Sequence, residues 1–433
     1  IGSVVRPPDQ RGPAGCCVAR RTQRRATITS RAETAESRSG ITDTQRQRQA
    51  GNPFADRMAE IDDLETLLRD DTPLIDARSP VEFAKGSLPA AINLPLMTDE
   101  EREAVGTCYK EQGTDAAVRL GHELVAGDLK EQRVGAWKTF VAQHPKGALF
   151  CFRGGMRSEI AQRWLKDAGV DYPRIKGGYK AMRRWLTDST DQFIEKTPLL
   201  LLGGPTGAAK TRILNEGNAG APIPGSVDLE GLANHRGSAF GRRVTEQPTQ
   251  ISFELALGVQ LLKHRHAGHQ KLLLEDEGRL IGRCALPLSL QAARHEADWV
   301  QLDATVDARV EHSYENYILQ NLEELMIQDA ARGFDHFATG LLESLERIQK
   351  RLGGQRYAEL KAVMQDALAA HERGNPETHK AWISELLTGY YDPMYDYQMN
   401  NRTKPPLFRG TEQEVVEYLL QSEDASLLGQ GPH

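Results

Sequence analysis

Cys151 lies where a short apolar run meets a loop suited to an anion. In "LFCFRGGMRSEIAQRW" (residues 149–164) the cysteine is followed by Arg153, two glycines and Arg157, and helical spacing of apolar residues begins there. Backbone N–H groups of a glycine-rich loop and of a helix N-terminus attract anions. A thiol in such surroundings is expected to be ionised and nucleophilic. The sequence therefore predicts a catalytic group of Cys151, Arg153 and Arg157, in which the arginines hold an oxyanion.

A second interpretation of Cys151 is also consistent with the residues. Cysteine is often a small, buried core residue, and Cys151 directly follows "GALF" (147–150), which has the pattern of a strand. The glycines and arginines favour the nucleophile over the core residue. They do not separate transfer of a chalcogen from chemistry on a phosphate.

A second glycine-rich loop, "GGPTGAAKT" (203–211), follows a run of four leucines and precedes a helix-like segment. This is the context of a P-loop, whose backbone N–H groups and lysine hold phosphates. The second glycine of the P-loop pattern is replaced by Ala209, which would cost about 1–2 kcal/mol if the position needs a left-handed backbone. The residues expected to bind phosphate are Gly204, Gly207, Lys210 and Thr211.

Downstream, "KLLLEDEGR" (271–279) is a second apolar run that ends in three acidic residues. A carboxylate at the end of such a strand can organise a metal ion beside a P-loop. Mg²⁺ is therefore a candidate ligand of Thr211 and Asp276, although acidic groups at strand ends are as often merely solvated. The chain's five cysteines show no metal-ligand spacing, and their odd number favours a reducing compartment.

Composition limits the function classes. The chain has 433 residues, 39% of them hydrophobic, and a formal net charge of −6. No apolar run approaches the roughly 20 residues needed to span a bilayer, so we expect a cytoplasmic protein without a membrane segment. The length predicts two domains. Residues 1–55 are rich in arginine and poor in large apolar residues, and we expect them to form a disordered tail, either a transit peptide or an upstream extension that includes Cys16 and Cys17.

The segment "LIDARSPVEFAKGSLPAAINLPL" (74–96) resembles the N-terminal signature of rhodanese-like sulfurtransferase domains, with Ser87 where that signature usually has histidine. The resemblance implies that Cys151 carries a chalcogen as a persulfide. Five residues separate Cys151 from Arg157, a loop length similar to that of the dual-specificity phosphatases that share the rhodanese fold. A phosphatase is therefore a competing interpretation of this domain.

Further segments resemble tRNA 2-selenouridine synthases: 228–241, 274–282, 351–354 and 390–398. The resemblance implies an α/β protein with a rhodanese-like parallel-sheet domain (56–190), then a P-loop NTPase-like α/β domain with a helical C-terminal part (191–433). It also implies that selenium from selenophosphate, the product of selenophosphate synthase, replaces the sulfur of wobble 2-thiouridine in tRNA. Geranyl diphosphate would first geranylate that sulfur, and no tightly bound cofactor is expected.

Several polar residues are candidate contacts under this resemblance. His235, Arg236 and Ser238 lie in a loop-like stretch that could touch either substrate, although a lone histidine is more often structural. The stretch "RIKGGYKAMRRW" (174–185) could bind tRNA phosphates and stack Tyr179 or Trp185 on a base; a solvated helix face is equally consistent. A nucleotide-gated binding module without chemistry is the other competing function. The basic candidates for tRNA are Lys176, Lys180, Arg183 and Arg184.

Overall fold

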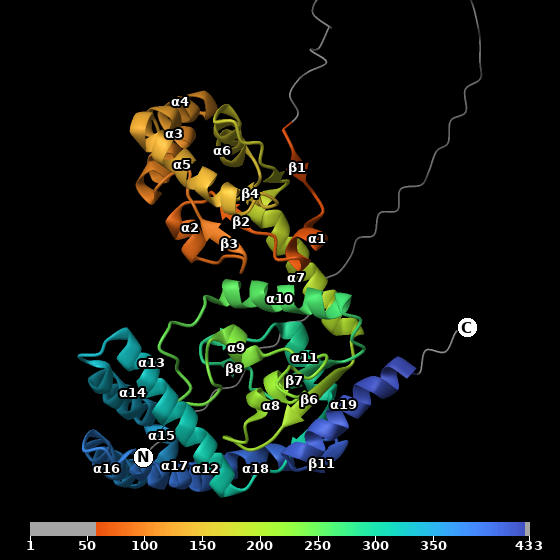
Figure 1. Ribbon diagram of the computed structural model, residues 1–433, viewed down its shortest axis with the longest axis vertical. Helices are drawn as coiled ribbons and strands as arrows, with labels where there is room; N and C mark the ends of the chain where they lie inside the picture. The colour runs from red at the N-terminus through yellow and green to blue at the C-terminus, as the bar shows by residue number, and fades with distance from the viewer. Residues whose placement is uncertain (1–57, 429–433) are drawn as a thin grey trace, which may run out of the picture. The chain divides into compact units, whose positions relative to one another are not determined.

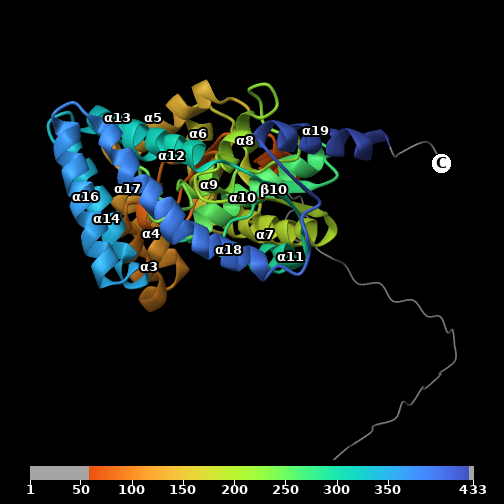
Figure 2. The ribbon, with the colours of Figure 1, turned by 90° about the horizontal axis from the view of Figure 1, so that it is seen from below.

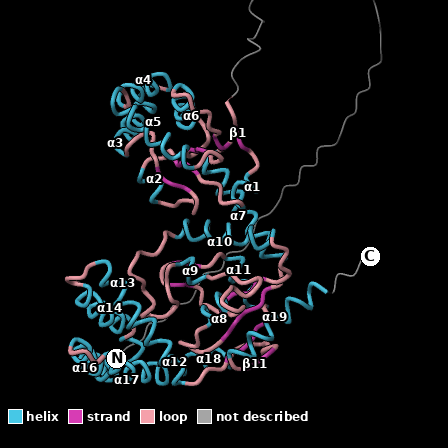
Figure 3. Tube along the Cα trace, in the orientation of Figure 1, coloured by secondary structure: helices cyan, strands magenta, loops and turns pink. Residues whose placement is uncertain are grey.

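The computed structural model describes residues 58–428, with side chains up to residue 422 (Figure 1). The predicted tail of residues 1–55, with Cys16 and Cys17, lies outside the described residues. Most of the described chain is helical, as the tube in Figure 3 shows. Among residues 58–428, no helix combines the length and the apolar character that crossing a membrane requires.

The first sheet has five strands, all parallel, and its central strands are short apolar runs. "LID" pairs with "AIN" on one side and with "ALF" on the other. Parallel sheets are covered on both faces, which explains why the central strands are buried throughout. In spatial order the strands are β1 (Glu60–Ile61), β5 (Arg174–Ile175), β4 (Ala148–Phe150), β2 (Leu74–Asp76) and β3 (Ala91–Asn93).

Helices cover both faces of this sheet. Trp137 and Trp164 pack in one cluster with Leu149, while Met182 packs with Phe150 in another, so successive residues of β4 face opposite layers. The helices are α1 (Leu64–Arg69), α2 (Pro80–Ala84), α3 (Asp99–Gln112), α4 (Thr114–Leu124), α5 (Gly127–Gln143), α6 (Met156–Asp167) and α7 (Gly178–Lys196).

The second sheet has four parallel strands and contains the run of leucines before the P-loop. Leu201 packs toward a cluster with Phe253 and Trp299, and Leu202 packs toward the opposite cluster with Val300. The spatial order is β11 (Phe408–Gly410), β10 (Asp298–Leu302), β6 (Leu199–Gly203) and β7 (Leu272–Glu275). Around it lie α8 (Lys210–Glu216), α9 (Leu229–Ala233), α10 (Gln250–His266), α11 (Leu288–Glu296), α19 (Glu412–Leu428) and the hairpin of β8 (Leu280–Ile281) and β9 (Cys284–Ala285).

The remaining C-terminal part is helical and has its own core. Phe337, Met364 and Trp382 are buried together there. In Figure 2 α14, α16 and α17 lie side by side, in agreement with their contacts. The elements are α12 (Val306–Tyr314), a π-helix η2 (Glu315–Gln320), α13 (Asn321–Gln328), α14 (Gly333–Arg347), α15 (Gln349–Leu352), α16 (Gly354–Glu372), η3 (Pro376–Thr378), α17 (His379–Leu386), a π-helix η4 (Leu387–Tyr391) and α18 (Asp392–Asn400).

The predicted fold class is confirmed: two parallel α/β units follow one another, and the second ends in helices. Helix α7 runs continuously through the boundary that the sequence suggested between residues 190 and 191. Leu186 of α7 packs in one cluster with Val259 of α10. The helix itself therefore joins the two sheets.

Candidate functional site

Cys151 is the first residue after β4, and its loop ends where α6 begins at Met156, one residue before the expected start. The side chain is only 3% exposed. Its Sγ lies 3.2 Å from Ser158 Oγ and 3.8 Å from the carbonyl oxygen of Gly155, to which the thiol donates. The thiol thus sits inside the loop, against the first turn of the helix. Its burial is consistent with both interpretations of Cys151, so its catalytic role stays a prediction.

The N-terminus of α7 holds the Cys151 loop through backbone hydrogen bonds. The backbone N–H of Tyr179 donates to the Cys151 carbonyl at 2.9 Å, and that of Lys180 donates to Phe152 at 3.0 Å. A Cβ at Gly178 would lie 2.2 Å from the Cys151 carbonyl oxygen, so only glycine allows this approach. The "KGG" turn therefore positions the cysteine loop.

Arg157 is engaged by Glu82 of α2. Its two terminal nitrogens donate to the carboxylate at 2.5 and 3.2 Å. Burial alone would raise the pKa of Glu82, yet the hydrogen bond and charge of Arg157 outweigh it, and the pKa is lowered. This ion pair occupies N–H donors of Arg157 and offsets its positive charge. Arg157 is therefore less able to bind an oxyanion than the sequence suggested. Arg153 is exposed, so it is the more available cation of the loop.

The structure corrects one prediction for the basic stretch 174–185. Tyr179 is 4% exposed, and the guanidinium of Arg78 lies 3.7 Å from the centre of its ring. Tyr179 is therefore part of the domain core and has no face free for a base. Trp185 packs partly against the same core. Lys176, Lys180 and Arg184 are exposed and Arg183 is half-buried, so their role as tRNA contacts stays a prediction.

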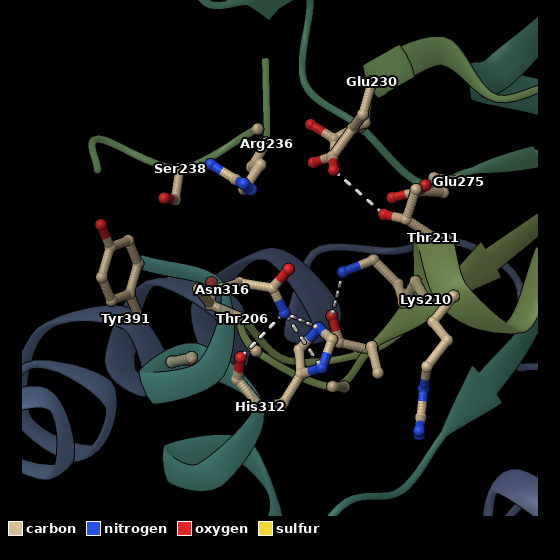
Figure 4. A pocket seen from close by; sticks show the side chains of 18 of the residues that line it. Thr206, Lys210, Thr211, Glu230, Arg236, Ser238, Glu275, His312, Asn316 and Tyr391 are labelled. Carbon is tan, nitrogen blue, oxygen red and sulfur yellow. Dashed lines mark hydrogen bonds between the residues drawn. The ribbon is translucent and has the colours of Figure 1, made fainter. Parts of the chain in front are cut away.

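The P-loop joins β6 to α8. Gly207 has a φ of +83°, and a Cβ there would lie 2.8 Å from Ser313 Oγ. Ala209 is left-handed, with φ 59° and ψ 30°, so the substitution for glycine does fall on a strained position. Lys210 Nζ donates to the Gly204 carbonyl at 3.3 Å, and it points into the cavity in Figure 4.

Restoring glycine at residue 209 is expected to stabilise the fold by about 1 kcal/mol, because relief of the left-handed strain exceeds the extra entropy of the unfolded chain. Urea denaturation of Ala209→Gly measures this. Ala208→Gly is the matched control. Ala208 is 5% exposed and does not have a positive φ, so the same change there is expected to destabilise the fold. Equal destabilisation by both changes would contradict the assignment.

The P-loop opens into a cavity of about 560 Å³. Figure 4 shows Lys210, Thr211, Glu230 and Glu275 on one side of it and Ser238 and Tyr391 on the other. Among its lining residues are Gly204, Gly207, Lys210, Thr211, Glu230, Arg236, Ser238, Glu275, Glu277, His312, Asn316, Tyr317, Tyr391 and Tyr395. The predicted phosphate-binding residues are thus all brought together here.

Three carboxylates lie beside Lys210: Glu230, Glu275 and Glu277, each with an oxygen within 4.8 Å of the others'. Thr211 Oγ1 donates to Glu230 at 3.0 Å. Asp276, the carboxylate that the sequence favoured for a metal, is instead paired with Arg294 and Arg402. Asp276 lines the same cavity, but these two arginines engage both of its carboxylate oxygens, so neither oxygen is free for a metal ion.

This cluster of three carboxylates suits a divalent cation. Burial and then the charge of Glu277 raise the pKa of Glu275 to about 8. Burial and then the charges of Glu275 and Glu277 raise the pKa of Glu230 well above its usual value. Glu275 Oε1 is buried without a hydrogen-bond partner. Mg²⁺ prefers oxygen ligands such as these carboxylates, and a bound cation would relieve the repulsion between their negative charges.

Mg²⁺ is expected to stabilise the protein more at pH 8 than at pH 6. A carboxyl pKa raised from 4.5 to about 8 gives stability that is complete below pH 4.5 and lost as the pH rises through 8. The cation compensates that loss, whereas at pH 6 it must displace protons. Differential scanning fluorimetry with and without Mg²⁺ measures the shift in Tm. Glu275→Gln is expected to remove the shift and the exposed control Glu296→Gln to retain it; equal shifts in both would contradict the site.

Only two of the three predicted polar contacts, His235, Arg236 and Ser238, reach the cavity. Arg236 and Ser238 line the cavity, whereas His235 is 6% exposed and lies outside its lining. Burial, followed by the charge of Arg242, lowers the pKa of His235 to about 4, so the ring is neutral at pH 7. His235 is thus a buried structural residue, the alternative that the sequence had left open.

The helical C-terminal part supplies residues that sequence reasoning missed. The π-helix η2 carries Asn316 and Tyr317 into the cavity, and η4 ends at Tyr391. Arg309 of α12 donates to the Thr206 carbonyl at 2.9 Å and pairs with Asp392, which fixes the P-loop to α18. The tyrosine-rich stretch 390–398 was the available signal, although it had been assigned no role.

Comparison with known proteins agrees with this arrangement. Residues 197–426 match the family described as the tRNA 2-selenouridine synthase AAA domain, and residues 60–184 match the rhodanese-like domain. Three curated relatives are named tRNA 2-selenouridine synthase. The protein of Marinobacter nauticus is 51% identical over 361 residues, covering 83% of this chain and 97% of the relative. That of Hahella chejuensis is 50% identical over 369 residues (85% and 96%), and that of Pseudomonas fluorescens Pf-5 is 48% identical over 360 residues (83% and 97%).

Such similarity extends over both sites described above, the cysteine loop and the P-loop cavity. Each of the three relatives aligns along nearly its full length, so both domains are part of the similarity. This chain therefore belongs to the tRNA 2-selenouridine synthase family.

Proposed function

We propose that this protein is a transferase that replaces the sulfur of wobble 2-thiouridine in tRNA with selenium from selenophosphate, through an S-geranyl intermediate. The observation that carries the proposal is the presence of two chemically different sites in one chain. One is a buried thiol in a glycine loop, and the other is a cationic P-loop beside three carboxylates. Each suits one of two successive reactions.

The P-loop cavity is proposed to hold geranyl diphosphate during alkylation of the sulfur. Lys210 and the loop N–H groups would neutralise the diphosphate leaving group as the sulfur attacks the first carbon of the chain. Thr211 and the carboxylates Glu230 and Glu275 would hold Mg²⁺, which adds positive charge at the leaving group. The half-buried lining tyrosines Tyr317, Tyr391 and Tyr395 would border the geranyl chain; burial raises the pKa of Tyr317 to about 12, so its hydroxyl is protonated.

The cysteine loop is proposed to act in selenation. S-alkylation makes the sulfur at C2 a better leaving group, and a selenium nucleophile then displaces it as geranylthiolate. Cys151 would deliver that selenium by attacking the phosphorus of selenophosphate: an S–P bond forms as the P–Se bond breaks, and selenide leaves as the nucleophile. Water would then hydrolyse the phosphocysteine to release phosphate, with Arg153 and the loop N–H groups stabilising the anion. Selenophosphate would come from selenophosphate synthase. The ion pair of Arg157 with Glu82 makes Arg157 a residue that positions the loop.

The tRNA is proposed to approach over the exposed cations next to the cysteine loop. Lys176 and Lys180 flank the "GG" turn whose backbone holds that loop, and Arg184 lies one turn further along α7. Contacts of this kind bind phosphates without reading sequence, so RNA affinity should fall as salt rises.

Mass spectrometry of nucleosides tests the function directly. A 2-thiouridine anticodon stem-loop is incubated with selenophosphate, with and without geranyl diphosphate. We expect geranylated nucleoside with the diphosphate alone and selenated nucleoside when both donors are present. Folded protein that forms neither product would refute the proposal, and release of phosphate from an aryl phosphate in a Cys151-dependent manner would favour a phosphatase instead.

A further inference from the structure

A second cavity, of about 460 Å³, lies in the rhodanese-like domain and is apolar where the P-loop cavity is polar. Helices α3 and α4 each present one face to it: Val105, Gly106 and Tyr109 from α3, and Ala117 and Gly121 from α4, at helical spacing. The deepest lining residues are nearly inaccessible, Leu96 at 3%, Val125 at 2% and Trp164 at 6%.

The cavity shares residues with the cysteine loop. Arg153, Met156 and Arg157, all within six residues of Cys151, line it. Met156 and Tyr109 are 46% and 58% exposed, so two large apolar side chains of the lining are open to solvent beside the polar loop. An apolar space that opens beside an anion-holding loop is suited to a molecule with a hydrocarbon part and a polar head.

Two of the charged residues in the lining are paired with one another. Arg157 and Glu82 neutralise one another at 2.5 Å. The remaining charged lining residues are the exposed Arg153, at the cysteine loop, and Arg102, whose Nε is buried without a hydrogen-bond partner. Most of the other lining residues offer contact to carbon. The size of the cavity falls within the roughly 300–1,000 Å³ typical of small-molecule sites.

We propose that this cavity receives the ten-carbon geranyl chain carried by the S-geranyl-2-thiouridine of tRNA, and so presents the modified base to the Cys151 loop. The inference rests on the proposed function, which supplies that intermediate. Retention of the chain in an apolar cavity distinguishes geranylated RNA from unmodified thiolated RNA before selenation. The cavity is thus a specificity site for the second reaction, separate from the P-loop cavity where the chain is transferred.

Filling the cavity tests the proposal. Gly106 lies within α3, and a Cβ built there meets nothing within 4 Å, so Gly106→Leu adds bulk to the lining and also improves helix propensity. Gly135→Leu is the matched control: it is the same change in α5, equally open, at an exposed residue outside the lining. Both variants are expected to fold.

The measurement is the Kd for stem-loops that carry S-geranyl- or S-methyl-2-thiouridine, made chemically. We expect wild type and Gly135→Leu to bind the geranyl RNA about tenfold or more tightly than the methyl RNA, because nine further carbons are buried. Gly106→Leu is expected to lose most of that preference. Equal binding of the two RNAs by wild type, or an unchanged preference in Gly106→Leu, would overturn the proposal.

A second measurement separates this proposal from the proposed function. Because the geranyl group is already on the RNA, binding is independent of the P-loop reaction, and a wild-type preference would survive a failure of geranyl transfer. Gly106→Leu is expected to leave transfer from geranyl diphosphate unchanged and to slow selenation of the preformed geranyl RNA. Slower transfer with unchanged selenation would mean that the cavity holds the donor, and the proposal would be wrong.

Discussion

Cys151→Ser is expected to abolish selenation, by a factor on the order of 10³ or more, while geranyl transfer continues at nearly the wild-type rate. Serine fits the space beside Ser158 but is a far weaker nucleophile than cysteine. The reaction should therefore stop at the geranylated nucleoside. Quantification of both nucleosides by mass spectrometry over time measures the two steps in one experiment.

Cys108→Ser is the control for this variant. Cys108 is a buried cysteine of the same domain, in α3, and its side chain lies outside the cysteine loop. Both steps should proceed as in wild type. Selenation that survives Cys151→Ser would show that selenium reaches the base directly from selenophosphate and would remove Cys151 from the mechanism.

Lys210→Ala is expected to lower geranyl transfer by about 10²-fold or more, because it removes the cation nearest the proposed diphosphate. Selenation that starts from thiolated RNA should fall with it, since no geranyl intermediate is supplied. Selenation of chemically geranylated RNA should continue. The three rates together locate the defect in the first step.

Lys196→Ala, at an exposed residue at the end of α7, is the matched control and is expected to leave all three rates unchanged. Lys210→Ala with a normal rate of geranyl transfer would exclude the P-loop as the diphosphate site. Loss of selenation on preformed geranyl RNA would instead place selenophosphate, and not geranyl diphosphate, at Lys210.

Local sequence correctly predicted the features that are formed by residues close to one another along the chain. The strand β4, Cys151 and the start of α6 lie within nine residues, and β6, the P-loop and Lys210 lie within twelve, so their order and spacing suffice. Ala209 was correctly singled out because the P-loop pattern itself requires a left-handed residue there. The two α/β domains were implied by the family resemblance, which local segments such as 74–96 and 228–241 carry.

What the sequence by itself determined was therefore the class of each loop and the chemistry open to it. Only the tertiary structure decided which side chains complete the sites. Arg157 meets Glu82 across 75 positions of sequence, and Arg309 meets Asp392 across 83. Glu230 of α9 lies beside Glu275 of β7, and α3 and α4 enclose an apolar space, only because packing brings separate elements together. Which residue pairs with a charged side chain, and what shape a cavity takes, depend on contacts between residues far apart in the sequence. A local sequence pattern cannot predict those contacts.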